Sequence, residues 1–481
     1  MIKSVIKDAL TYTVPAVLTR GIAILLLPIY TRIADLGELG ALDLFLAFGN
    51  LVALTVALEI HQAVARFIPE LSDTKLKIAY SSTGLIFTFI MYLLFGVISY
   101  NYFHEFNLLI TGNPIYADPF KLLIIYFVLY GVFIYSQNQL RFEGEGARYG
   151  TVSIVHAVLN LLSAYVLGFV YDLGLLGIIY SMIFSILASL SLTLFFSRHS
   201  FGFVFRFGLL KALLKFSIPL VPSSILVFIS LYMDRFMLSE MIGLQSVGLY
   251  GVAIRLSMAA SLVMYGFQMA ITPLIYKHYN DPETPDNLSV IFKYFVVFSM
   301  LFFVVYSLST RELLILFATP EFLIVSKIIP VLFVSFLLSN MYIFMPGIAI
   351  RKKTYLFFFV NLVAALINIV LNYLLIPHFG MFGAAIATVL SSFSAFLCYA
   401  YLSQKLYFVN HNWFQYSLIL IFSITLVVTY FVIGSYFEYI ETLLLRVALI
   451  IILIGAMFYI NLITRNELLI FKRGAIKIMN R

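Results

Sequence analysis

The sequence predicts an all-α, polytopic membrane protein with about 14 transmembrane helices, and three observations support this fold class. Of the 481 residues, 63% are hydrophobic and 11% are charged, and the mean hydropathy is +1.04. Apolar runs of about 20 residues, the length that crosses the hydrocarbon of a bilayer, recur along the whole chain. The connections between these runs are too short to hold a separate soluble domain. We therefore expect the protein to function within the bilayer.

Fourteen candidate spans follow one another along the chain. They begin near Tyr12, Leu42, Ala79, Phe120, Thr151, Leu175, Phe216, Val247, Val290, Ile328, Tyr355, Met381, Trp413 and Leu443. The first residues, MIKSVIKDALTY, contain no cleavage site of small residues, so we interpret them as the cap of the first span rather than a removed signal peptide. Lysines and arginines concentrate in alternate connections and in the C-terminal tail. Because basic loops stay in the cytoplasm, both termini are predicted to be cytoplasmic.

Two halves of the sequence resemble each other. At a shift of 206 residues Gly174 aligns with Gly380, and at a shift of 208 Gly40 aligns with Gly248. This shift places span five on span eleven and predicts two six-helix lobes in the same orientation. Parallel repeats around a midplane site are typical of transporters whose lobes rock to open alternately to each side. The predicted units are an N-terminal lobe of residues 1–207, a C-terminal lobe of residues 208–405, and a terminal helix pair with a basic tail, residues 406–481.

Two arginines lie near the middle of predicted spans. Arg20 interrupts the first span, TVPAVLTRGIAILLLPIY, and Arg255 lies in span eight. A charged side chain at the centre of a span costs at least about 3 kcal/mol and usually faces a water-filled path. A guanidinium stays protonated and presents a planar fork of donors that fits phosphate oxygens. We therefore predict that Arg20 and Arg255, one in each lobe, bind a pyrophosphate.

Small and polar side chains recur on single helical faces at three-, four- and seven-residue spacing. Span two, for example, places Asp43, Asn50 and His61 on one stripe. Lining of a cavity or gate is one interpretation of such stripes, and helix packing with hydrogen bonds across the contact is the other. The predicted cavity and gate residues are Asp43, Asn50, His61, Arg66, His156, Asn160, Ser223, Asp234, Arg235 and Asn368.

The charged members of this set each keep two interpretations. Asp43 either balances Arg20 or caps its helix. The adjacent Asp234 and Arg235 form either a gate ion pair or an ordinary interfacial pair. The segment LEIHQAVARF, at the inner end of span two, either senses protons and gates the inner side or is a solvated helix end.

Motifs for bond chemistry are absent from the sequence. It contains no GxxxxGK[ST] loop for ATP and no GxSxG nucleophile elbow,. The single cysteine, Cys398, has no intrachain partner, and the scattered histidines disfavour a zinc site,. The net charge of +8 is spread over many loops, so it reflects membrane topology rather than a nucleic-acid surface. We predict that the protein is not an enzyme and uses no cofactor.

Three short motifs resemble polysaccharide flippases: the early stretch PxxxTRGIxxLLLPIYTR, the DR pair of span seven, and the VGLYGxAxR opening of span eight. These flippases are the O-antigen and capsule lipid-linked oligosaccharide transporters of the multidrug/oligosaccharidyl-lipid/polysaccharide exporter superfamily. The resemblance implies a bacterial cytoplasmic-membrane protein that moves an undecaprenyl-pyrophosphate-linked sugar unit from the inner to the outer leaflet by alternating access. It also implies that Arg20 and Arg255 engage the pyrophosphate.

The resemblance leaves the driving force open among proton flow, sodium flow and membrane potential. Expected partners are the lipid-linked oligosaccharide, membrane lipids and the polysaccharide polymerase machinery, and no nucleic acid.

Three alternatives stay open. A multidrug exporter of the same superfamily shares the fold, but its cavity should centre on acidic residues. A lipid II flippase is closer, and the sequence separates it poorly from an oligosaccharide flippase. A membrane-embedded glycan polymerase or ligase handles the same lipid carrier but usually needs a sizeable outer loop. The longest outer connection, from Asn101 to Pro119, offers only His104, Glu105 and Asp118 as chemically active groups.

Overall fold

The computed structural model describes residues 15, 18–19, 21–261, 264, 267–268, 271, 275, 278–353 and 355–463. Over this part of the chain the protein consists of helices and their connections, without strands, and the predicted all-α class is confirmed. Eleven described segments are long and apolar enough to cross a membrane. Predicted spans one and eight both include residues outside the described set, so the total of about 14 stays a prediction.

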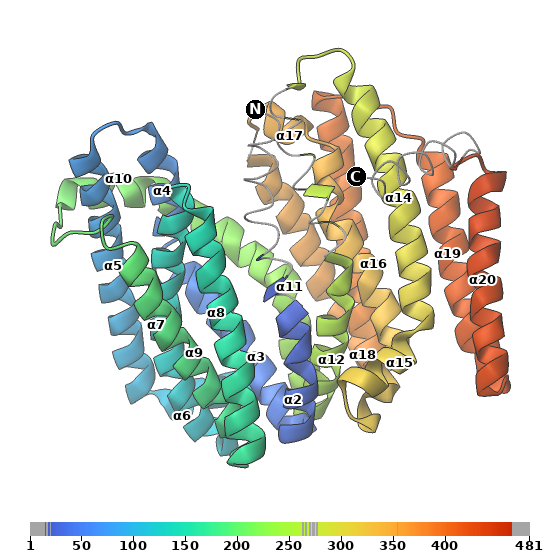
Figure 1. The fold of residues 1–481 in the computed structure, drawn as a ribbon, viewed down its shortest axis with the longest axis horizontal. Helices are drawn as coiled ribbons and strands as arrows, with labels where there is room; N and C mark the ends of the chain where they lie inside the picture. Colours follow the sequence, from blue (N-terminus) through green and yellow to red (C-terminus); the bar gives the residue numbers. More distant parts are fainter. Residues whose placement is uncertain are drawn as a thin grey trace, which may run out of the picture. The chain divides into compact units, whose positions relative to one another are not determined.

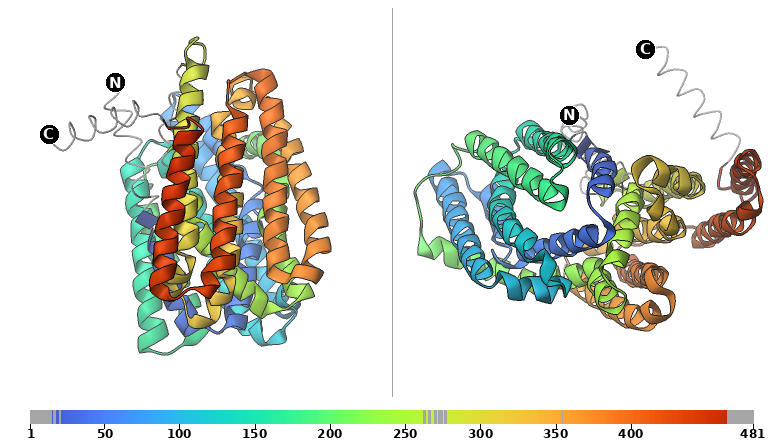
Figure 2. Two further views of the ribbon diagram at one scale, coloured as in Figure 1. Left: turned by 90° about the vertical axis from the view of Figure 1, so that its right-hand side faces the viewer. Right: turned by 90° about the horizontal axis from the view of Figure 1, so that it is seen from below.

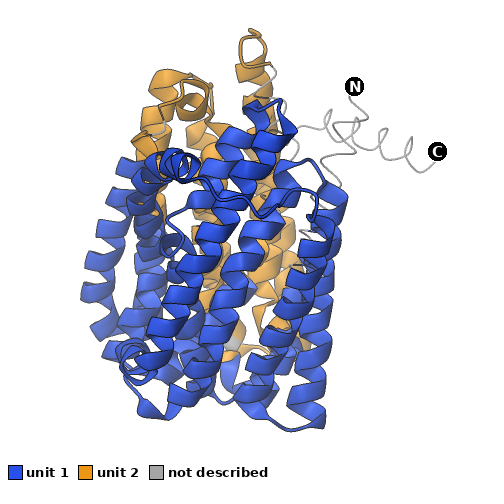
Figure 3. Ribbon diagram, turned by 90° about the vertical axis from the view of Figure 1, so that its left-hand side faces the viewer, with its two compact units in different colours: residues 1–256, 316–322, 358–391 blue, residues 257–315, 323–357, 392–481 orange. Residues whose placement is uncertain are grey.

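The chain divides into two compact units (Figure 3), and each is described by itself. Unit 1 comprises residues 1–256, 316–322 and 358–391, and unit 2 comprises residues 257–315, 323–357 and 392–481. The predicted division at residues 207 and 405 stays a prediction.

Unit 1 is built from consecutive helices and part of α18. Its helices are α2 (Leu27–Ile33), α3 (Leu36–Thr55), α4 (Ile60–Phe67), α5 (Thr74–Asn101), α6 (Phe103–Thr111), α7 (Ala117–Phe142), α8 (Gly146–Tyr165), α9 (Gly174–Phe196), α10 (Phe207–Ser217), α11 (Val221–Met241) and α12 (Leu244–Ser257).

Helices α5, α7, α8 and α9 of unit 1 form a bundle, and α10 lies across the ends of α4 and α5 (Figure 1). Helix α9 buries a stripe of small polar side chains at four-residue spacing, Ser181, Ser185, Ser189 and Thr193. Most of these hydroxyls donate to carbonyl groups of their own helix. The stripe therefore lets helices approach closely in an apolar environment without leaving those donors unpaired.

The glycines that align between the two halves of the sequence have matching structural roles. Gly174 and Gly380 both adopt left-handed backbone conformations, with φ of 56° and 57°, which glycine adopts without steric cost. Gly174 begins α9, and Gly380 separates two helices within α18 (Tyr355–Leu406). Gly40 and Gly248 pack α3 directly against α12, because a Cβ on either would strike the backbone of the other helix.

The predicted stripe of span two is wrong at its far end. Helix α3 ends at Thr55, and the chain passes through two left-handed residues, Leu58 and Glu59, before α4 begins at Ile60. His61 therefore lies on a different helix from Asp43. Neither left-handed residue is a glycine, so the local sequence gives no warning of this break.

Unit 2 packs around α14. Its helices are α14 (Thr284–Leu308), α15 (Thr310–Phe317), α16 (Ile328–Asn340), α17 (Gly347–Ile350), α19 (Trp413–Ile433) and α20 (Tyr439–Tyr459), together with the end of α18. Helices α19 and α20 run side by side along α14 (Figure 2). An aromatic cluster fixes one end of α14, where the ring of Phe292 lies 4.9 Å from that of Phe344 and 4.6 Å from that of His411, centroid to centroid.

Candidate functional site

A buried charge cluster joins three helices of unit 1. Asp43 of α3 accepts hydrogen bonds from two arginines: its Oδ2 from Nε of Arg235 on α11 at 2.8 Å, and its Oδ1 from Nη2 of Arg255 on α12 at 2.6 Å. The side chains of Asp43 and Arg235 are 10% and 9% exposed, whereas that of Arg255 is 24% exposed. One carboxylate thus binds two guanidinium groups, and that of Arg255 is partly exposed to solvent.

A second carboxylate completes the cluster. Asp234 accepts from the backbone N–H of Arg235 at 2.9 Å and from the hydroxyl of Tyr250 at 3.0 Å. The hydroxyl of Thr388, from α18, donates to the same carboxylate at 3.4 Å. Nη1 of Arg235 lies 3.7 Å from the Asp234 carboxylate. Two carboxylates and two guanidinium groups therefore balance, as burial in a low-dielectric environment requires.

Neighbouring residues position this cluster. Gly251 makes room for the carboxylate of Asp43, because a Cβ on that glycine would lie 3.0 Å from its Cγ. Arg235 is held further by a 2.7 Å hydrogen bond from Nη1 to the carbonyl of Leu231 and by the ring of Tyr232, 4.8 Å from its guanidinium carbon. Arg235 is thus fixed from several sides, and Arg255 is the cation better placed to exchange its partner.

The structure places four of the predicted site residues in this one cluster: Asp43, Asp234, Arg235 and Arg255. Arg20 lies outside the described residues. The capping interpretation of Asp43 is wrong, because Asp35 caps α3 and Asp43 lies inside the helix. The pair of Asp234 and Arg235 is no ordinary interfacial pair either, since these residues are 3% and 7% exposed.

Three predicted cavity residues lie elsewhere and make local contacts. The side-chain amide of Asn50 donates to the carbonyl of Leu46 in its own helix at 2.8 Å. The side-chain oxygen of Asn160 accepts a hydrogen bond from the hydroxyl of Ser181 at 3.0 Å, which joins α8 to α9. The side-chain oxygen of Asn368 accepts from the side-chain amide of Asn372 at 2.9 Å. Of these three, the contact of Asn160 crosses between helices and agrees with the helix-packing interpretation, whereas those of Asn50 and Asn368 lie within one helix,.

His156 is also apart from the cluster. Its ring lies 5.6 Å from that of Phe133, and its Nδ1 is buried without a hydrogen-bond partner in the described part of the chain.

The segment LEIHQAVARF divides into a buried and an exposed part. Glu59 is 3% exposed and accepts a 2.6 Å hydrogen bond from the hydroxyl of Ser224 at the start of α11. His61 lies beside it, with Nε2 3.5 Å from Oε2 of Glu59. Arg66 instead forms an exposed ion pair with Glu70, one turn along the chain. The predicted Ser223 is half-buried, and its neighbour Ser224 makes the contact that sequence reasoning missed, because periodicity does not distinguish adjacent serines.

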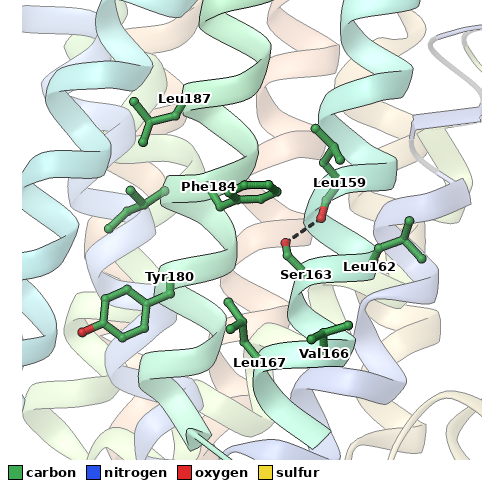
Figure 4. Close-up of a pocket in the computed structure, with 9 residues that line it drawn as sticks. Leu159, Leu162, Ser163, Val166, Leu167, Tyr180, Phe184 and Leu187 are labelled. Carbon is green, nitrogen blue, oxygen red and sulfur yellow. Dashed lines mark hydrogen bonds between the residues drawn. The ribbon is translucent and has the colours of Figure 1, made fainter. Parts of the chain in front are cut away.

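An apolar pocket of about 560 Å³ lies between α8 and α9 (Figure 4). Its polar members are few: the hydroxyl of Ser163 donates to the carbonyl of Leu159 across one helical turn, and Tyr180 contributes mainly its ring. The other lining residues are Leu162, Val166, Leu167, Ile183, Phe184 and Leu187. This pocket suits hydrocarbon and does not suit an anion.

Comparison with known proteins gives one family match and several solved structures of similar fold. The family model "Polysaccharide biosynthesis protein" matches residues 5–279, which is more than half of the chain. No curated protein matches the sequence. A solved structure of the lipid II flippase MurJ, in an inward closed conformation, matches with a TM-score of 0.70 and 16% identity, over 94% of this chain and 99% of that chain.

Two MATE transporters have the same fold. An inward-facing MATE family transporter of the MOP superfamily matches with a TM-score of 0.63 and 15% identity, over 80% of this chain and 93% of that chain. A mutant of the Vibrio cholerae MATE transporter VcmN matches with a TM-score of 0.56 and 17% identity, over 84% of this chain and 99% of that chain. At these identities the likeness concerns the fold.

Proposed function

We propose that this chain, which belongs to the polysaccharide biosynthesis protein family, is a flippase for an undecaprenyl-pyrophosphate-linked oligosaccharide. It moves a surface-polysaccharide repeat unit, such as that of O-antigen, from the inner to the outer leaflet of the bacterial cytoplasmic membrane. The observation that carries the proposal is the cluster in which Asp43 holds Arg235 and Arg255 inside a helical membrane protein.

The cluster gives the pyrophosphate a place to bind without leaving a bare charge in the membrane. Asp43 neutralises Arg255, which avoids the cost of an unpaired guanidinium. A phosphate group that enters displaces the carboxylate from Arg255, while Arg235 keeps Asp43 in place through its own hydrogen bond. When the headgroup leaves, Asp43 returns to Arg255. Binding and release thus exchange one anion for another at the same cation.

The transport cycle that follows from this exchange needs no bond chemistry. The glycan and pyrophosphate enter between the lobes while the prenyl tail stays in lipid, and rocking of the lobes exposes the headgroup on the other side. Coupling to a proton or sodium gradient, or to the membrane potential, supplies direction. The product is available to polysaccharide polymerase machinery in the outer leaflet.

The test is transbilayer movement of a fluorescent prenyl-pyrophosphate oligosaccharide in proteoliposomes. Arg255→Gln should slow flipping about 10- to 100-fold, because it removes a charge-assisted hydrogen bond worth about 1.5–3 kcal/mol. Arg255→Lys should slow it less, since lysine keeps the charge without the planar fork. Arg446→Gln is the matched control, because that arginine of α20 forms its ion pair with Glu312 of unit 2 and is not part of the charge cluster. Arg20→Ala tests the second predicted ligand.

The outcomes separate the candidate functions. Normal flipping by Arg255→Gln at matched insertion contradicts the assigned role of the cluster. Flipping of lipid II but not of the oligosaccharide identifies a lipid II flippase, which has the same pyrophosphate chemistry. Export of organic cations with no lipid movement identifies a multidrug exporter.

A further inference from the structure

The break between α3 and α4 contains a buried carboxyl group, that of Glu59, and one of its two oxygens accepts no hydrogen bond in the described part of the chain. Oε1 of Glu59 accepts the Ser224 hydrogen bond, whereas Oε2 is buried and accepts no hydrogen bond from the described part of the chain. The cost of leaving a buried acceptor unpaired is about 1–3 kcal/mol, and it is larger when the group is charged. A neutral carboxyl avoids that cost if its proton lies on Oε2 and points at an acceptor.

His61 is the acceptor in reach. Its Nε2 lies 3.5 Å from Oε2 of Glu59. Burial lowers the pKa of His61 below its ordinary value, and this effect exceeds the opposing attraction of the carboxylate. The imidazole is therefore neutral near pH 7 and able to accept a hydrogen bond from a protonated Glu59.

The backbone holds this arrangement under strain. Leu58 and Glu59 have φ of 51° and 55°, and left-handed conformations of non-glycine residues cost on the order of 1–3 kcal/mol each. Such strain persists only where surrounding contacts enforce it, and it gathers at functional sites. Here the two strained residues turn the Glu59 side chain inward to Ser224.

Helix α11 and the α3–α4 segment also carry residues of the charge cluster. Helix α11 contacts the α3–α4 segment at Ser224 and again at Arg235, which binds Asp43. These two positions on α11 are eleven residues apart, or about 16 Å at 1.5 Å per residue. A change at Glu59 can therefore alter how α11 is held against α3, and with it the anion site.

We propose that Glu59 is a proton-binding site whose ionisation releases the contact between the α3–α4 break and α11. The protonated acid donates from Oε2 to His61 and keeps the Ser224 hydrogen bond. Loss of the proton to water leaves a charged, half-paired carboxylate in a buried site. Hydration of that carboxylate then draws the start of α4 away from α11.

Few titratable groups surround Glu59 in the described structure. Besides His61 of α4, Tyr92 of α5 interacts with it electrostatically. Helix α11 contributes the hydroxyl of Ser224, and the lysines of α10, which packs on α4, are exposed. A pH response in this region therefore reports on the pair of Glu59 and His61.

The direct test is an infrared pH titration of the protein in lipid nanodiscs, which needs no substrate. The spectrum of the parent protein minus that of Glu59→Gln should contain the carbonyl band of one protonated carboxyl, which appears as the pH falls. Glu143→Gln is the matched control, because both oxygens of that carboxylate accept hydrogen bonds, from Gln139 and Ser200 at 2.7 Å each. A difference spectrum that lacks this band overturns the assignment.

A second measurement follows the release itself. Ala63 of α4 is fully buried, so Ala63→Cys in a Cys398→Ala background reports opening through its alkylation rate. The same cysteine is also placed in the Glu59→Gln protein, and the alkylation rate with Glu59 is divided by the rate in Glu59→Gln. This ratio should increase several-fold as the pH rises. Because ionisation of the thiol affects both rates alike, it cancels in the ratio. A ratio that does not change with pH overturns the proposed release.

The inference rests on the proposed function only for its consequence for transport, and the two can fail separately. If no lipid is flipped but the Glu59 band and the alkylation ratio respond to pH, the proton site stands and the flippase proposal falls. If the oligosaccharide is flipped but both responses are absent, the flippase proposal stands and the proton site falls.

Discussion

Two ion-pair clusters, a buried one in unit 1 and a partly exposed one in unit 2, differ in how the charges are shared. In unit 1 the single carboxylate of Asp43 serves two guanidinium groups, Arg235 and Arg255. In unit 2 Arg446 of α20 has two partners of its own: Nη2 donates to Glu312 of α15 at 2.6 Å, and Nε donates to the hydroxyl of Tyr430 on α19 at 2.9 Å. In the second cluster one guanidinium group faces one carboxylate, whereas in the first a single carboxylate is shared between two guanidinium groups.

This difference indicates different roles. Arg446 lies under the ring of Tyr430, 5.3 Å from its centroid, and its side chain is 11% exposed, so it clips α15, α19 and α20 together. Arg255 shares the carboxylate of Asp43 with Arg235, and its side chain is 24% exposed. An entering anion can therefore replace Asp43 at Arg255 at a small cost in free energy. We expect loss of function from changes in the first cluster and a modest loss of stability from changes in the second.

The largest expected effect is that of Asp43→Ala. This change leaves two guanidinium groups without their shared carboxylate, and breaking a buried pair typically costs about 3–5 kcal/mol. The unfolding free energy in mild detergent, from denaturant titration, should fall by that amount, and flipping should stop. Asp43→Asn, which keeps the shape and one of the two acceptor oxygens, should cost less. A loss no greater than that of Glu312→Gln would contradict the comparison.

A pH effect is expected in unit 2, where a buried histidine is neutral. His411 is 6% exposed and lies between the rings of Phe292 and Trp413, and burial lowers its pKa to about 4. The unfolded chain binds this proton near pH 6.5, so stability should fall as the pH decreases from about 6.5 to about 4 and then level off. Thermal unfolding across this range should show the trend, and His411→Phe should flatten it. An unchanged slope in that variant would assign the trend to other groups.

The contact between α3 and α12 gives a smaller effect that bears on the first cluster. A Cβ on Gly40 would strike the carbonyl of Leu244, and overpacking of this kind costs about 1–3 kcal/mol. Because α3 carries Asp43 and α12 carries Arg255, Gly40→Ala should reduce flipping as well as stability. The control is Gly455→Ala in α20, where no atom lies within 4 Å of the added Cβ, and stability there should rise by about 0.5–1 kcal/mol. Equal responses at both glycines would rule out the steric explanation.

Sequence reasoning found the members of the charge cluster but not their pairing. Charged residues within apolar runs are conspicuous, so Asp43, Asp234, Arg235 and Arg255 could all be selected from the sequence. The partner of Asp43 could not, because Arg235 and Arg255 lie 192 and 212 residues away, and periodicity relates only residues within one helix. Most span positions followed from hydropathy in the same way, because each span is a local property of the chain.

The left-handed break before α4 was missed for a related reason. Leu58 and Glu59 are ordinary helix-compatible residues, and the contact recorded at this break is a hydrogen bond to Glu59 from Ser224, which is distant in sequence. Tertiary contacts override local propensity at such positions, and no single-sequence signal marks them.

The smallest effect should be that of Glu312→Gln in unit 2. The amide still offers an oxygen to Arg446 but no charge, and Glu312 is one-third exposed, 33% by side chain, so water screens the pair. We expect a loss on the order of 1 kcal/mol in unfolding free energy, with flipping per folded molecule unchanged. Raising the salt concentration should reduce the difference between Glu312→Gln and the parent protein, because exposed pairs are screened. If Glu312→Gln instead stops flipping while the protein stays folded, the contacts that join α15, α19 and α20 take part in transport. The division between a functional cluster in unit 1 and a structural cluster in unit 2 is then wrong.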